Sequence, residues 1–169
     1  MPGMTAKRIV VAGATGSIGE SAAEVMREHP SSFRPVAFAA LKSRERCEAL
    51  AREFGAKAYL GEDSALRAVE ESDADICLVA TVGASGVAPA LAAIEKGMDV
   101  ALATKEVMVI AGDEFVAAAR RRGVRMLPVD RAQRDLPVHT VRRRGLAPRP
   151  HGVGRPVSRR PGGPFVRHP

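Results

Sequence analysis

The feature that most constrains this chain is a short apolar run that leads directly into three glycines, each three residues after the last. Gly13, Gly16 and Gly19 lie in the segment GATGSIG, immediately after residues 8–12. A strand that turns at once into a helix needs glycine for the tight turn and for close backbone approach. The first N–H groups of such a helix have no partner inside it, so they suit a pyrophosphate. The segment predicts a nucleotide site, and a tight turn that only lets a helix pack closely is the alternative.

The body of the chain alternates short β-branched runs with longer segments of helical period. This pattern is typical of βαβ units, so we predict an α/β fold with a Rossmann-like doubly wound parallel sheet. The expected strands are Arg8–Ala12, Pro35–Ala40, Ala58–Leu60, Ile76–Ala80, Val100–Ala103 and Arg125–Val129. The expected helices are Ser17–His29, Arg44–Phe54, Asp63–Glu71, Val87–Lys96 and Gly112–Arg122. Gly55, Gly97 and Gly123 follow three of these helices and fit left-handed caps.

Ligands of such a sheet bind outside the carboxyl ends of its strands, which selects the glycine segment and residues 41–44, 81–86 and 104–106. After the second strand an NAD enzyme usually carries an acid, whereas this chain has Lys42, Ser43 and Arg44. Cationic and hydroxyl groups attract a 2′-phosphate, so NADP is favoured over NAD. Ordinary solvated residues at a helix start are the alternative.

Lys105 and Glu106 follow the apolar run at 100–103. We expect both side chains to project near the nicotinamide end of the cofactor rather than into the core. A lysine there could hold a hydroxyl or phosphate of the substrate, and a surface ion pair is the alternative.

Composition divides the chain near residue 130. Residues 131–169 carry ten arginines and one acid, so they contribute +9 to a net charge of +7, and residues 1–130 sum to −2. Seven of the twelve prolines also lie there, so we expect a domain at 1–130 and a disordered basic tail at 131–169. The tail lacks interleaved aromatic residues, so nucleic-acid binding is not expected.

Two widely spaced cysteines, Cys47 and Cys77, form no C-x-x-C pair, and the N-terminus carries no charged-then-apolar leader or long apolar span. We expect a soluble, cytoplasmic chain without a membrane segment, in which each cysteine is a small packed residue.

Five motifs in register resemble 1-deoxy-D-xylulose 5-phosphate reductoisomerase. They are GATGSIG at 13–19, VGASG at 82–86, ATKE at 103–106, AG at 111–112 and LPVD at 127–130. The resemblance covers residues 7–130 and implies the N-terminal, NADPH-binding domain of that enzyme. It also implies rearrangement and reduction of a sugar phosphate to 2-C-methyl-D-erythritol 4-phosphate in non-mevalonate isoprenoid synthesis, with Mg²⁺ or Mn²⁺. The family dimerises, so a homodimer is among the expected assemblies.

The resemblance also implies roles for individual residues. Those around the cofactor phosphates are Gly13, Thr15, Gly16, Ser17 and Ile18, with Lys42 and Ser43 beside the 2′-phosphate. Thr104 and Glu106 would contact the nicotinamide half, Lys105 would hold the substrate, and Asp130 would be the first carboxylate ligand of the metal.

This chain departs from the family pattern in three places. Thr104 stands where the family usually has Asn, and Leu41-Lys42-Ser43 where it commonly has Gly-Lys-Asn. After Asp130 the family continues Ser-Glu-His and then Asn-Ala-Ile-Phe-Gln, and this chain reads RAQRDLP. With suitably chosen synonymous codons, a one-base shift near codon 131 restores Glu-His-Asn-Ala-Ile-Phe-Gln, so we hypothesise a frameshift that the gene sequence would test.

Without a second metal carboxylate, the chain is expected to bind the dinucleotide but to be inactive alone. The alternatives are a non-catalytic NADP-binding module and another NADP-dependent oxidoreductase, such as a semialdehyde or homoserine dehydrogenase.

Overall fold

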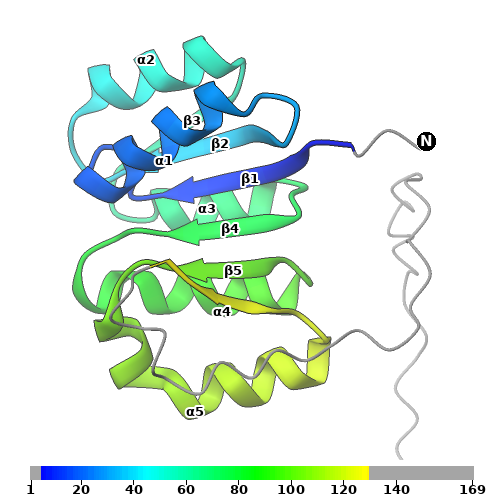
Figure 1. Ribbon diagram of the computed structural model, residues 1–169. Helices are drawn as coiled ribbons and strands as arrows, with labels where there is room; N and C mark the ends of the chain where they lie inside the picture. The colour runs from blue at the N-terminus through cyan, green and yellow to red at the C-terminus, as the bar shows by residue number, and fades with distance from the viewer. Residues whose placement is uncertain (1–4, 130–169) are drawn as a thin grey trace, which may run out of the picture.

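The computed structural model describes residues 5–129, which form a parallel sheet with helices on both faces (Figure 1). The strands are β1 (Lys7–Ala12), β2 (Phe33–Ala40), β3 (Lys57–Leu60), β4 (Ile76–Val79), β5 (Asp99–Leu102) and β6 (Met126–Pro128). The helices are α1 (Ser17–Glu28), α2 (Arg44–Phe54), α3 (Ser64–Glu71), the 3-10 turn η1 (Gly83–Gly86), α4 (Val87–Glu95) and α5 (Lys105–Arg122). The predicted tail and Asp130 lie outside the described residues.

The strand order within the described residues is β3-β2-β1-β4-β5-β6, and every neighbouring pair is parallel. The chain winds outward from β1 to β3, crosses back to β4 beside β1, and then winds outward in the other direction. This arrangement confirms the predicted Rossmann-like α/β fold. The order reverses between β1 and β4, which is where such sheets open a crevice for ligands.

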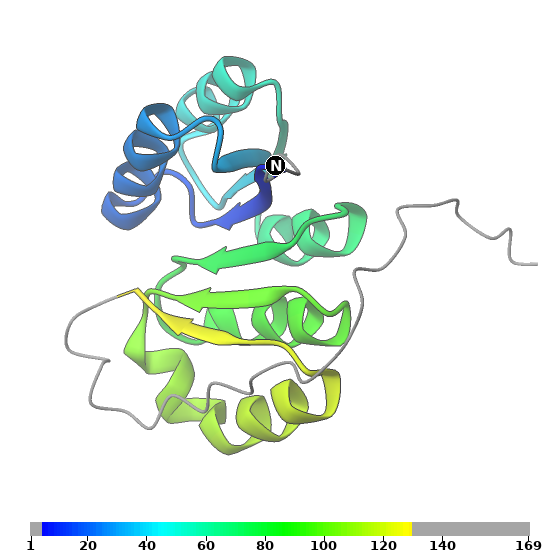
Figure 2. The same cartoon turned by 45° about the vertical axis from the view of Figure 1, so that its right-hand side comes forward.

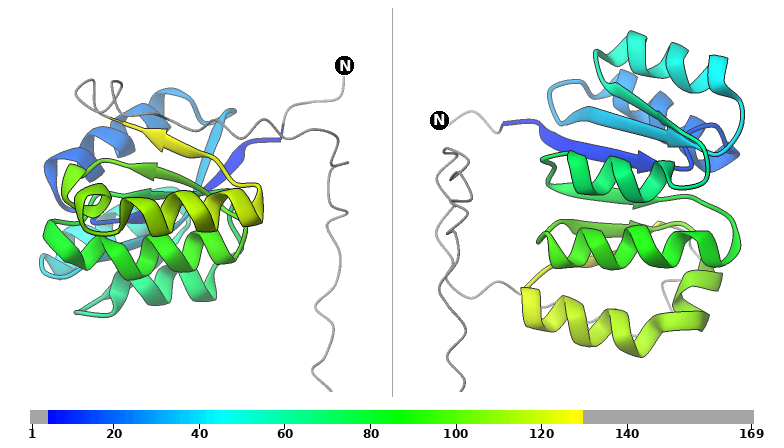
Figure 3. Two further views of the ribbon diagram at one scale, coloured as in Figure 1. Left: turned by 90° about the horizontal axis from the view of Figure 1, so that it is seen from below. Right: turned by 180° about the vertical axis from the view of Figure 1, so that it is seen from behind.

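Two apolar clusters fill the space between the sheet and its helices. One joins Val10 and Val79 to buried residues of α3, α4 and α5, with Phe115 fully buried. The other joins Val11 and Phe38 to buried residues of α1 and α2. The helices therefore form two layers, as Figure 2 shows in an oblique view and Figure 3 shows from below and from behind. Alternate residues of β1 enter opposite clusters, which explains why its sequence is apolar without interruption.

The helix predicted at Gly112–Arg122 is the second segment of α5, and the prediction missed the first, because α5 begins at Lys105. A kink explains the difference. Ala111 has non-helical angles (φ −135°, ψ 21°), so the helical period breaks there. Val109 and Ile110, just before the kink, are 82% and 57% exposed, whereas an amphipathic helix would bury such residues. The turn η1 was also not predicted.

Local chemistry accounts for most other boundaries. Gly55, Gly97 and Gly123 have φ of +64°, +79° and +64°, so the predicted left-handed conformations are confirmed. The strand β2 begins two residues before the predicted Pro35. Pro35 is tolerated because a register shift between Ile9 and Val10 interrupts the β1–β2 ladder beside it.

Both cysteines are buried, as expected for packed residues. Burial raises the pKa of the Cys77 thiol to about 12. Burial also raises the pKa of Cys47, whose Sγ lies 3.5 Å from the Phe38 carbonyl oxygen. No helix in residues 5–129 is long and apolar enough to cross a membrane.

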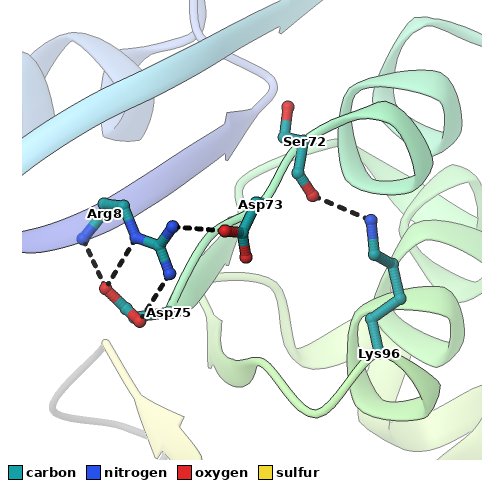
Figure 4. A network of polar contacts seen from close by, with 5 residues as sticks. All are labelled: Arg8, Ser72, Asp73, Asp75 and Lys96. Carbon is teal, nitrogen blue, oxygen red and sulfur yellow. Dashed lines mark hydrogen bonds and ion pairs between the residues drawn. The ribbon is translucent and has the colours of Figure 1, made fainter. Parts of the chain in front are cut away.

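The amino end of the sheet carries a network of paired charges (Figure 4). Arg8 pairs with Asp73, and its Nη2 donates to Asp75 at 3.2 Å. The backbone N–H of Arg8 also donates to the Asp75 carboxylate at 2.9 Å. Arg125 repeats this arrangement beside β6, where its backbone N–H and guanidinium donate to Asp99 at 2.6–3.0 Å.

Candidate functional site at the carboxyl end of the sheet

The carboxyl ends of the inner strands are level, so the loops that follow them meet at one edge. Ala12 at the end of β1 stands opposite Ala39 of β2 and Val79 of β4, and Val79 stands opposite Leu102 of β5. The glycine segment and the loops at 41–44, 80–86 and 103–106 therefore leave the sheet together, as the sequence predicted.

Two glycines of the first loop are required by close backbone approach. Gly13 has φ +88°, and a Cβ there would lie 2.5 Å from the Ala80 carbonyl oxygen. A Cβ on Gly19 would collide with the Gly13 carbonyl oxygen and lie 2.6 Å from that of Ala14. Gly16 differs, because a Cβ there would meet Gly13 at an ordinary 3.7 Å. Gly13 thus lets the loop pack against the residues just after β4. Gly19 lets α1 pack against the loop.

The start of α1 carries no side-chain cap. Gly16 is the N-cap in an extended conformation, and its own N–H bonds back to Gly13 at 3.4 Å. Gly16 and Ser17 are exposed, and Thr15 and Ile18 are half-buried. Because the first N–H groups of a helix have no partner inside it, this end presents donors to an anion. Glu20, the acid of the first turn, is paired with Arg46 of α2 at 2.7 Å.

The loop after β2 contains a strained residue. Ser43 has φ 58° and ψ 54°, a left-handed conformation that is uncommon for serine, and it is the N-cap of α2 without a side-chain cap bond. Lys42 and Arg44 on either side are exposed. Arg44 makes a 3.4 Å ion pair with Glu48 that is open to solvent and therefore weak. Hydroxyl, cation and helix start converge here, which suits a phosphate.

The ends of β4 and β5 each carry a buried hydroxyl that lacks a hydrogen-bond partner among the described residues. These are Thr81 Oγ1 and Thr104 Oγ1. A buried hydroxyl without a partner is costly, and a ligand that supplies one removes that cost. Thr104 is also the N-cap of α5, and Lys105 and Glu106 in the first turn are exposed. A polar group of a bound cofactor fits this place.

The edge brings together every described residue that the sequence assigned to a site. Asp130 follows β6 but lies outside the described residues. Sequence reasoning missed the left-handed Ser43, for which serine gives no signal, and the Glu20–Arg46 pair, which joins two separate helices. Sequence reasoning selected residues 81–86 as a ligand-binding loop but gave no role to the hydroxyl of Thr81.

No group of three or more His, Cys, Asp or Glu side chains in residues 5–129 is placed to hold a metal ion.

The doubly wound sheet, its glycine loop and its uncapped helix define a Rossmann-like domain of the kind used by nucleotide-dependent oxidoreductases. The model of the 1-deoxy-D-xylulose 5-phosphate reductoisomerase family matches residues 9–60 and 44–112, two overlapping segments. The chain belongs to this family.

Individual relatives agree with that assignment. The reductoisomerase of Symbiobacterium thermophilum is 39% identical over 73% of this chain and 39% of its own length. That of Ralstonia nicotianae is 34% identical over 94% of this chain and 46% of its own length. The chain thus spans less than half of the curated relatives it matches.

Solved structures are similar in the same way. The reductoisomerase of Zymomonas mobilis, solved in complex with NADPH, is 30% identical with a TM-score of 0.69 over 75% of this chain and 39% of that chain. A reductoisomerase solved with NADPH, fosmidomycin and magnesium is 28% identical with a TM-score of 0.67 over 73% of this chain and 36% of that chain.

Proposed function

We propose that this chain binds NADPH at the carboxyl end of its sheet, as the dinucleotide-binding part of a reductoisomerase. The substrate of that enzyme would be 1-deoxy-D-xylulose 5-phosphate and its product 2-C-methyl-D-erythritol 4-phosphate. The observation that carries the proposal is the cradle in which Gly13 and Gly19 bring an uncapped helix start against the end of β1. The relatives solved with NADPH support it.

Four consecutive residues are proposed to hold the pyrophosphate. The backbone N–H groups of Ser17 and Ile18 lie at the start of α1, Gly16 allows the phosphates to approach the backbone there, and Thr15 adds a hydroxyl from the loop. The Glu20–Arg46 ion pair supports this role, because Arg46 offsets the one acidic charge of the first turn. Bare glycine backbone at 13 lets this loop pack against residues 80–81 and so fixes its position beside the end of β4.

Lys42 and Ser43 are proposed to select NADPH over NADH. The 2′-phosphate would lie at the start of α2, where Lys42 is exposed and Ser43 presents its hydroxyl without capping the helix. A cation favours the extra phosphate, whereas the acid typical of NAD enzymes would repel it.

Thr104 and Glu106 are proposed to contact the nicotinamide half, and Lys105 to hold the phosphate or a hydroxyl of the substrate. The unpartnered Thr104 hydroxyl supports this placement. When bound, NADPH supplies the hydride for the reduction. The residues named here orient that ring and the substrate.

A divalent cation, Mg²⁺ or Mn²⁺, completes the proposed site, with Asp130 as its first ligand. A relative solved with magnesium supports the metal. We place the boundary of the domain at residue 130, with the basic segment 131–169 beyond it. Because this chain reads RAQRDLP after Asp130, where the family carries a second metal carboxylate, we propose that the 169-residue chain binds cofactor without turnover. A homodimer remains the proposed assembly.

Calorimetric titration of the 169-residue chain with NADPH and with NADH tests the cofactor proposal. We expect saturable NADPH binding at least tenfold tighter than NADH binding, which corresponds to ~1.4 kcal/mol. Equal affinities would contradict the role of Lys42 and Ser43, and no binding would contradict the site. Oxidation of NADPH with the sugar phosphate and Mg²⁺ present would contradict the proposed lack of turnover.

A further inference from the structure

Gly86, the last residue of η1, sits where three buried side chains meet. A Cβ on this glycine would lie 2.8 Å from Thr81 Oγ1, 2.8 Å from Val107 Cγ2 and 2.9 Å from Val79 Cγ1. The three neighbours come from the end of β4, the loop after it and the first turn of α5. All are β-branched and stiff, so none can yield easily to a new methyl group.

The contact with Val107 holds the segment of α5 that carries the candidate nicotinamide and substrate residues. Val107 is completely buried, two residues after Lys105, whereas Val109 and Ile110 are exposed. The kink at Ala111 separates this first segment, residues 105–110, from the rest of α5. The packing of Val107 against Gly86 therefore joins this first segment to η1.

The shape of η1 brings Gly86 to this contact. Gly83 begins the turn with φ +61°, and the Ser85 hydroxyl donates to the Val82 carbonyl oxygen at 2.6 Å. Thr81 Oγ1, buried beside Gly86, has no partner among the described residues, and neither has Thr104 Oγ1 at the next strand end. Gly86 thus touches one unpartnered hydroxyl directly and sets the position of the other through Val107.

We infer that Gly86 is a positioning residue for the nicotinamide half of the cofactor. It allows η1 and residues 105–110 to pack so closely that Thr81 and Thr104 present their hydroxyls at adjacent strand ends. The inference also adds Thr81 to the residues that contact this half. It rests on the proposed function, because it assumes that NADPH occupies the edge.

The test compares two ligands of the full chain. Adenosine 2′,5′-bisphosphate reports on the adenosine half alone, and NADPH reports on both halves. In Gly86→Ala we expect the Kd of the bisphosphate to stay within about twofold, while the Kd of NADPH rises about tenfold, the size expected for one or two lost hydrogen bonds. Gly112→Ala is the matched control, because its Cβ would meet only Met108 Cε at 3.7 Å and should change neither constant.

A second variant keeps the test decisive if Gly86→Ala does not fold. Val107→Ala removes the packing against Gly86 without adding bulk, so it should weaken NADPH selectively as well. The pair Gly86→Ala with Val107→Ala should recover part of the lost NADPH affinity, because it relieves the contact with Val107 Cγ2 while those with Thr81 and Val79 remain.

The possible outcomes separate the two proposals. Equal weakening of both ligands, unchanged NADPH affinity in Gly86→Ala and Val107→Ala, or no recovery in the double variant would each overturn the positioning role. Failure of the unaltered chain to bind either ligand would overturn the proposed function itself.

Discussion

At the amino end of the sheet several charged side chains are held by hydrogen bonds and ion pairs, whereas at the carboxyl end several polar groups have no partner among the described residues. Asp99 accepts three hydrogen bonds from Arg125, and Lys96 Nζ donates to the carbonyl oxygens of Val69, Glu70 and Ser72 at 2.7–2.8 Å. At the other end, within residues 5–129, α1 and α2 begin without side-chain caps, and two threonine hydroxyls are buried without partners.

The difference assigns separate tasks to the two ends. Lys96 caps the carbonyls at the end of α3, and the Asp–Arg pairs join the starts of neighbouring strands, so the amino end stabilises the fold. The carboxyl end also bears strain at Ser43 and leaves donors open. Such strain persists where a bound ligand offsets it, so damage to the amino end should affect stability alone, whereas damage to the carboxyl end should affect binding, with or without a loss of stability.

The largest effect is expected from Gly19→Ala. The new methyl would collide with backbone atoms of Gly13 and Ala14, which cannot rotate away. We expect a loss of about 2–3 kcal/mol of unfolding free energy and of about 100-fold or more in NADPH affinity. Gly16→Ala is the control for stability, because its Cβ has ordinary contacts. Wild-type stability and affinity in Gly19→Ala would show that the loop does not need the close approach.

At the amino end, Asp99→Ala should lower the unfolding free energy by about 2 kcal/mol, because a nearly buried carboxylate that accepts three hydrogen bonds is lost. The NADPH affinity of the folded protein should stay within about twofold. Denaturant unfolding and calorimetry measure the two quantities. Glu95→Ala, which removes an exposed pair with Arg122, should cost under about 1 kcal/mol. A large loss of NADPH affinity in Asp99→Ala would contradict the inference that the amino end stabilises the fold without affecting cofactor binding.

The reverse pattern is expected for Lys42→Ala. NADPH should bind about fivefold to tenfold more weakly, NADH should be unaffected, and the unfolding midpoint should not move, because Lys42 is exposed. Lys57→Ala, which removes an exposed lysine at the start of β3, serves as the matched control. Equal weakening of both dinucleotides would place the 2′-phosphate elsewhere.

The smallest expected effect is the pH dependence that Asp75 contributes. Partial burial acts to raise the pKa of Asp75, but hydrogen bonds from Arg8 outweigh it and lower the pKa below its ordinary 3.8. The pair therefore stabilises the fold above pH ~4, and this contribution is lost as the pH falls through the lowered pKa. Denaturant unfolding from pH 7 to 3 should show a shallower decline in Asp75→Asn than in the unaltered chain. An identical decline in both proteins would show that Asp75 does not contribute to the pH dependence of stability.

The sequence predicts the fold well because the strands of a sheet covered on both faces are continuous apolar runs, and glycines end three of the helices. It predicts the edge that holds the site because parallel strands end together. The first segment of α5, residues 105–110, was missed because Val109 and Ile110 are exposed, so the segment lacks the pattern of an amphipathic helix. The roles of Gly86 and Thr81 depend on a contact between segments about twenty residues apart, which no local pattern encodes.

Backbone hydrogen exchange of the full chain with and without saturating NADPH tests the division between the two ends most directly. We predict slower exchange on binding at residues 13–19, 42–46, 81–86 and 104–107, and no change at the amino-end residues 72–75, 96–99 and 124–125. NADH at the same concentration should protect the segment 42–46 less than NADPH does. Protection at the amino end, or none at the glycine loop, would contradict the account.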